Sequence, residues 1–159
     1  MAQNYDPALA ELVRNCLNES GWKYDFDPEK GHITFGMNLK GKLKSIRFVI
    51  TINEKDCNVY AVSPLSADQN DPEQLRQMAE FVCRANYGLK DGNFELDFRD
   101  GELRYKTYVN CDGMLPTAAI VKRSYLVPLA MFERYGQGIL GILFTGMSAE
   151  DAVRLCEGK

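Results

Sequence analysis

The sequence has 159 residues, 26% of them charged, and a formal net charge of −3. This length is that of one domain and needs no metal or disulfide to fold. The acidic balance argues against nucleic-acid binding, which draws on Lys and Arg contacts to phosphates. The amino-terminal residues lack a secretory pattern, and the apolar runs are too short to span a membrane. We therefore expect a cytoplasmic protein with neither a nucleic-acid nor a membrane partner.

The five cysteines are isolated from one another and include no C-x-x-C pair. An odd number of separated cysteines favours free thiols in a reducing compartment. Cys16 and Cys83 fall on apolar helix stripes and are expected in the core. Cys111, beside Asp112 in a turn, is expected to be the exposed thiol.

The first half of the chain predicts one helix followed by four strands. Asp6-Pro7 is typical of a helix start, and apolar residues then recur at helical spacing to about residue 20. Alternating apolar residues follow in four segments, residues 22–26, 33–39, 46–52 and 59–62. Short turns between these segments require antiparallel pairing.

The second half predicts a helix, a hairpin and two more helices. Asp71-Pro72 repeats the helix start, and Gly88 suits the end of that helix. Asp100-Gly101 between alternating apolar residues indicates a hairpin of residues 94–98 and 103–109. A long helix is expected from about Thr117 to about Phe144, and Ser148 suits the start of a short last helix.

These elements predict a single α+β domain over residues 1–159. We expect a mostly antiparallel sheet of about six strands, in the order α-ββββ-α-ββ-α(α), with the helices packed on one face. No linker or internal repeat divides the chain.

Residues 136–141 match the G-x-G-x-x-G pattern of dinucleotide-binding proteins letter for letter. That pattern needs a strand before its first glycine and a helix after its last. Here the preceding segment is expected to be helical, so the glycines are interpreted as a closely packed or flexible part of a helix. We expect no cofactor.

The residues that could carry catalysis are few. His32 is the single histidine and is expected on a solvated strand, and no cluster of Cys or His suggests a metal. Glu95 and Asp97 share one strand face and would serve acid-base chemistry only if they were buried. The sequence therefore predicts no catalytic residues and no enzyme.

The last third of the chain is dense in apolar and aromatic residues. They do not form one narrow stripe, so a sandwiched helix and an interface are equally good interpretations. The candidate interaction surface for a partner or a homodimer consists of Leu126, Leu129, Phe132, Tyr135, Ile139 and Leu143.

Several local strings resemble the YbjN family of bacterial proteins. They are Asn86-Tyr87-Gly88, the stretch from Asn93 to Tyr105, and Gly146 to Ala152. The resemblance implies a fold similar to that of type III secretion chaperones, a nonenzymatic role in sensory-transduction regulation, and dimerisation. The glycine-rich residues 136–146 depart from it.

Two functional hypotheses follow. The first is a regulatory or chaperone-like adaptor, homodimeric, that binds an unknown protein or peptide through a sheet edge or a helix surface. The alternative is a small-molecule-binding protein or an unrecognised enzyme, with a pocket between the long helix and the sheet lined by Tyr105, Tyr125 and Phe132.

Overall fold

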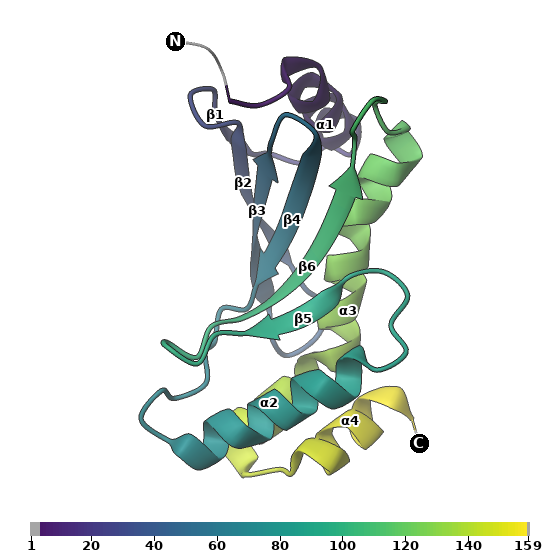
Figure 1. Cartoon of the computed structure of the whole chain (residues 1–159). Coiled ribbons are helices and arrows are strands. Elements are labelled where there is room, and N and C mark those ends of the chain that lie inside the picture. Colours follow the sequence, from purple (N-terminus) through teal and green to yellow (C-terminus); the bar gives the residue numbers. More distant parts are fainter. Residues whose placement is uncertain (1–3, 159) are drawn as a thin grey trace.

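The computed structural model describes residues 4–158, which form one six-stranded sheet and four helices (Figure 1). The helices are α1 (Pro7–Glu19), α2 (Pro72–Asn86), α3 (Ala118–Thr145) and α4 (Ala149–Glu157). The strands are β1 (Asp25–Asp27), β2 (His32–Asn38), β3 (Ser45–Ile52), β4 (Asp56–Val62), β5 (Asn93–Leu96) and β6 (Leu103–Asn110). The predicted α+β class and element order are confirmed.

The strands follow the spatial order β1-β2-β3-β4-β6-β5, and every neighbouring pair is antiparallel. β1 and β5 are therefore the two edges. The first strand is shorter than predicted because Trp22 leaves the sheet and packs its ring against Phe35 and Tyr125.

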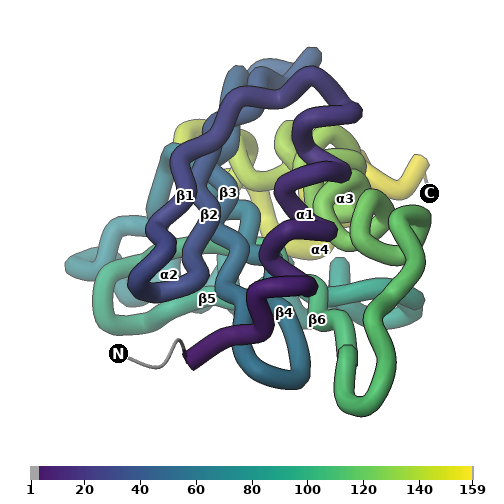
Figure 2. The backbone as a smooth tube through the Cα atoms, turned by 90° about the horizontal axis from the view of Figure 1, so that it is seen from above, coloured from purple at the N-terminus to yellow at the C-terminus, as the bar shows by residue number. Residues whose placement is uncertain are grey.

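One face of the sheet is covered and the other is open. Along β3, Phe48 and Ile50 are buried, while Arg47 and Val49 between them point to the open side. α1 and α3 lie together on the covered side, behind the sheet in Figure 1 and beside each other in the view from above (Figure 2). The helices α2 and α4 pack beyond the end of the sheet, against each other and against α3.

The predicted helix starts are confirmed by their hydrogen bonds. Asp6 Oδ1 accepts from the backbone N–H of Ala8 at 2.8 Å, and Asp71 Oδ1 accepts from that of Gln74 at 3.0 Å. Ser148 Oγ accepts from the N–H of Asp151 at 3.1 Å. Each cap satisfies a backbone donor that the helix leaves unpaired and contributes about 1 kcal/mol.

The glycine-rich segment is continuous helix. α3 runs through Pro128 and the glycines and ends at Gly146, which has a left-handed φ of 66°. A Cβ at Gly138 would lie 2.8 Å from Cys156 Sγ and from Phe81 Cε2. The glycine therefore allows α2 and α4 to approach α3. The close contacts at Gly138 confirm the packing interpretation of the G-x-G-x-x-G letters. The letters lie inside α3 and so lack the strand directly before the first glycine that dinucleotide binding requires.

Among the helices of residues 4–158, none has both the length and the apolar character that crossing a bilayer requires.

Two glycines of α3 give a matched test of this packing. Gly138→Ala should lower the free energy of unfolding by about 1–3 kcal/mol, because the new methyl group meets the carbonyl oxygen of Ala152, 2.9 Å away, which cannot turn aside. Gly136→Ala should raise it by about 0.5–1 kcal/mol through helix propensity, because its Cβ would make an ordinary contact 3.5 Å from Leu43. Urea unfolding followed by circular dichroism measures both, and equal effects would contradict the packing role.

Candidate functional site

The predicted interaction surface on α3 divides into buried and accessible residues. Phe132, Tyr135 and Ile139 are at most 1% exposed and belong to the core, so for them the prediction is wrong. They turn toward β5, α2 and α4, which the long helix meets after it leaves the sheet. Leu126 is 46% exposed, and Leu129 and Leu143 are partly buried.

The predicted pocket between α3 and the sheet is closed. Tyr105, Tyr125 and Phe132 are all buried within the core, and they do not share one neighbourhood. The ring of Tyr105 packs edge-on against Phe94, as does that of Phe132. Tyr125 instead packs near α1, where its hydroxyl lies 3.1 Å from Ser20 Oγ. The prediction of a pocket lined by these three side chains is therefore wrong.

Two carboxylates beside each other at the end of β5, Glu95 and Asp97, are ion-paired. Glu95 Oε2 accepts from Arg104 Nε at 2.6 Å, and Asp97 Oδ2 lies 2.6 Å from Arg99 Nη2. Hydrogen bonds from Arg99 lower the pKa of the Asp97 carboxyl to about 2. An acid with so low a pKa is fully ionised at neutral pH and unsuited to donating a proton.

His32 lies on β2, half-buried, on the open side of the sheet. Within residues 4–158, no group of three or more His, Cys, Asp or Glu side chains converges as metal ligands would.

The exposed thiol differs from the predicted one. Cys83 is exposed on α2, whereas Cys111 is only 8% exposed, so both assignments are corrected. Cys83 lies on the side of α2 that faces β5 across a hollow open to solvent. Cys111 is held against the preceding hairpin, where its N–H donates to the carbonyl of Lys55 at 2.7 Å. Cys16 is buried as predicted.

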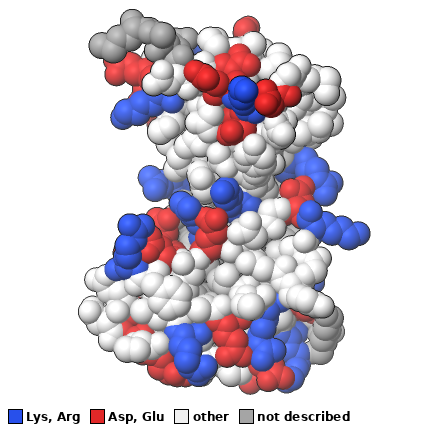
Figure 3. Space-filling view, in the orientation of Figure 1, with Lys and Arg blue, Asp and Glu red and all other residues white. Residues whose placement is uncertain are grey.

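A groove of about 590 Å³ runs between α2 and the free edge of β5. Its helix wall consists of Ala79, Val82 and Cys83. The opposite wall consists of β5, the following turn and the start of β6, that is, Phe94, Glu95, Leu96, Asp97, Phe98, Arg99, Glu102 and Arg104. Phe98 is 60% exposed at its mouth. The hollow is visible above α2 in the space-filling view (Figure 3).

Along the free edge of β5, the backbone of Phe94 is hydrogen-bonded and the backbone of Leu96 is unpaired among the described residues. The Asn86 side chain accepts from the N–H of Phe94 at 2.7 Å and donates to its carbonyl at 2.9 Å, as a neighbouring strand would. The backbone N–H of Asp97 points the other way and donates to the carbonyl of Glu102, just before β6. Because hydrogen-bonding directions alternate along a strand, the backbone N–H and carbonyl of Leu96 point to the free edge. Among residues 4–158, the Leu96 N–H has no acceptor beyond its pairing with β6.

The open sheet face begins where the groove ends. Arg104, which lines the groove, lies beside Val62 on β4, and Val62 lies beside Arg47 on β3. The Arg104 guanidinium also stacks 4.3 Å from the ring centre of Tyr60. The groove and the open face are thus two parts of one continuous surface.

A family model described as “Putative bacterial sensory transduction regulator”, the YbjN family, matches residues 9–122. That match covers more than half of the chain. The chain belongs to the YbjN family. No curated protein sequence matches it. The YbjN match ends early in α3, so the α2–β5 groove and the open face both lie inside the matched residues.

Sequence reasoning missed the groove of this YbjN protein, although one signal was present. Phe98 stands beside the turn of the predicted hairpin, where an aromatic side chain has little to pack against. Asn86 carried no such signal, because its bonds to Phe94 depend on how α2 meets the edge strand.

The asparagine cap on β5 is testable by stability. Asn86→Ala leaves the N–H of Phe94 unpaired and its carbonyl with the Asn93 side chain, 3.2 Å away, as its one side-chain donor, so it should lower the free energy of unfolding by about 1–3 kcal/mol. Asn18→Ala, an equal change at an exposed position of α1, should alter it by less than about 0.5 kcal/mol. Thermal or urea unfolding measures the pair; indistinguishable stabilities would rule out the cap.

Thiol reactivity tests the orientation of α2. One thiol should react with Ellman's reagent well before the rest, and Cys83→Ser should remove that phase, because Cys83 is exposed. Desolvation by burial raises the pKa of the other four, Cys16, Cys57, Cys111 and Cys156, which disfavours the reactive thiolate. All five should react in denaturant, and a fast phase that survives Cys83→Ser would place α2 differently.

Proposed function

We propose that this YbjN-family protein is a regulatory adaptor that binds an extended segment of a partner protein in the groove between α2 and β5. The observation that carries the proposal is the open edge at Leu96, whose backbone is free to pair with an added strand beside a hollow of about 590 Å³. Strand addition uses such edges, with main-chain bonds for affinity and pockets for specificity.

The groove suits apolar side chains framed by charge. Its walls carry the apolar side chains of Ala79, Val82 and Leu96, and Phe98 offers an exposed aromatic ring at the mouth. The ion pairs of Glu95 with Arg104 and of Asp97 with Arg99 form the rim. A buried apolar centre with a charged rim is the usual composition of a protein interface.

The family description supports regulation rather than catalysis. The ion pairs of Glu95 and Asp97 beside the groove support a binding role as well. We place the protein in the cytoplasm, where its free thiols are stable. A homodimer would use the accessible part of α3, around Leu126.

Peptide selection tests the groove. Peptides selected from a random 12-residue library on the wild-type protein should bind Phe98→Ser about tenfold more weakly, a loss of about 1.4 kcal/mol. They should also slow the reaction of Cys83 with a maleimide, because Cys83 lines the same groove. Fluorescence anisotropy and mass spectrometry provide the two measurements.

Phe144→Ser is the matched control, because Phe144 is 70% exposed but lies outside the groove lining. It should leave peptide affinity unchanged. The proposal fails if no peptide is selected, or if selected peptides bind both variants equally and leave the Cys83 reaction rate unaltered.

A further inference from the structure

We infer that the open sheet face beside the groove recognises an acidic stretch of the same partner segment, so that the full site takes an extended peptide with apolar residues next to several carboxylates. The inference rests on the proposed function and adds the chemistry of the partner. It starts from the charges that the open face leaves uncompensated.

Three cations project from the outward rows of β3 and β6, namely Arg47, Arg104 and Lys106. We call them the cationic strip. Arg104 is paired with Glu95, but within residues 4–158 neither Arg47 nor Lys106 forms an ion pair. Two cations without a carboxylate partner on one face of an otherwise acidic chain mark a surface that favours an anionic ligand.

An apolar floor lies between these cations. Tyr60, on β4, contacts two of them, with the Arg104 guanidinium 4.3 Å and Lys106 Nζ 5.9 Å from its ring centre. Val62 lies between Arg104 and Arg47 in the register of β6, β4 and β3. Arg47 and Arg104 are thus two strands apart, about 10 Å. An extended chain can lie on this floor and extend its carboxylates to the cations.

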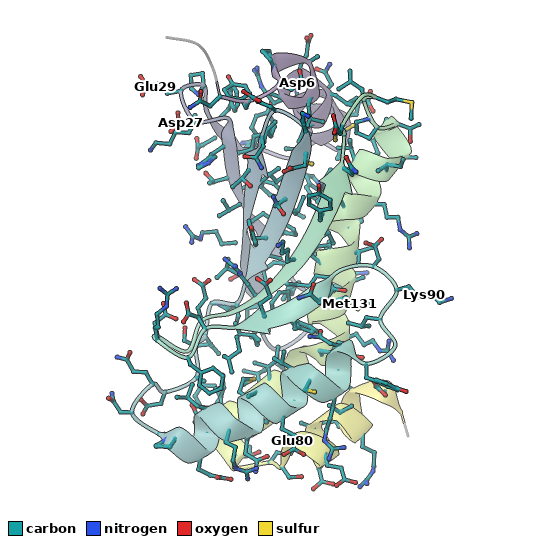
Figure 4. All side chains as sticks on the ribbon, in the orientation of Figure 1. Asp6, Asp27, Glu29, Glu80, Lys90 and Met131 are labelled. Atoms are coloured by element: carbon teal, nitrogen blue, oxygen red, sulfur yellow. The ribbon has the colours of Figure 1, made fainter. Side chains whose placement is uncertain are left out.

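Hollows continue the strip on both sides. Lys106, Lys90 and the exposed Tyr108 line one of about 420 Å³, and Lys90 projects outward from the loop between α2 and β5 (Figure 4). Arg47, Gly36 and Val62 line another of about 590 Å³, and a Cβ at Gly36 would meet only one atom within 4 Å, a carbonyl oxygen 4.0 Å away. The open face therefore has room for side chains as well as charge to hold them.

The strip joins the groove directly. Arg104 belongs to the groove lining and also to the strip, so residues next to a groove-bound stretch reach the strip without a gap. In the space-filling view Lys and Arg side chains lie across the middle of this face, with Asp and Glu side chains between them and the hollow (Figure 3).

The charges favour a peptide over a nucleic acid. Glu95, Asp97 and Glu102 lie among the cations at the groove rim, and they would repel a backbone that carries a charge on every nucleotide. A peptide can space its carboxylates to meet the cations and place apolar side chains where the rim is acidic.

The test uses a random 16-residue peptide library selected on three forms of the full chain. Wild type should select peptides with Asp and Glu adjacent to apolar residues. Arg47→Glu combined with Lys106→Glu should lose the acidic preference and bind wild-type-selected peptides about tenfold more weakly, an effect that added salt diminishes. The control, Lys40→Glu combined with Lys42→Glu, makes the same charge change in the loop whose backbone N–H groups donate to Glu133 of α3. It should keep the preference for acidic peptides.

The outcomes separate this inference from the groove itself. Apolar peptides without acidic enrichment, which still depend on Phe98, would overturn the acidic partner and leave the groove function intact. If none of the peptides selected on the wild-type chain depended on Phe98, both the acidic partner and the groove function would be overturned. Tight binding of a fluorescent single-stranded oligonucleotide that the Arg47 and Lys106 changes abolish would replace the peptide with a nucleic acid. Self-association in light scattering that those changes abolish would replace it with a second copy of the chain.

Discussion

The structure depends on one aromatic junction, built around Phe94 on the edge strand. Its ring packs edge-on against Tyr105 of β6 and against Phe132 and Tyr135 of α3, at centroid distances of 4.8, 5.5 and 5.4 Å. Tyr135 then contacts Phe81 of α2. The sheet, the long helix and α2 thus meet at a single set of rings. Aromatic pairs of this geometry add to the free energy of simple area burial.

That junction also explains why a groove exists. Phe94 is drawn into the core, and its backbone is closed by Asn86, so α2 is held close to the first part of β5. β5 ends at Leu96, and the chain turns at Asp97 through Gly101. α2 continues past that point with Val82 and Ala79 facing the gap. The hollow arises because helix and strand share an anchor at one end and diverge at the other.

How far the fold could be predicted differs between local and long-range features. Alternation and caps were sufficient for the strands and helix starts, because Asp6, Asp71 and Ser148 act on residues within the same turn. The site was not predictable in this way. Whether β5 is an edge depends on the strand order β4-β6-β5, and the burial of Phe132, Tyr135 and Ile139 depends on α3 leaving the sheet for α2 and α4. A helix covered on several sides has no single apolar stripe, so its sequence fits a sandwiched helix and an interface equally well.

The uncovered face is the counterpart of the covered one. The pleat that sends Phe48 and Ile50 into the core sends Arg47 and Val49 outward, so the strand pattern that builds the core also displays a charged and aromatic face. α1 and α3 occupy one side, and α2 is held below the sheet by its contacts with α4 and β5, so no helix in the described residues 4–158 covers the other side. The YbjN match includes every strand of that face but ends early in α3. The matched residues therefore contain the groove and the open face together with the sheet core, whereas most of the helix that supports the sheet from behind lies outside the match.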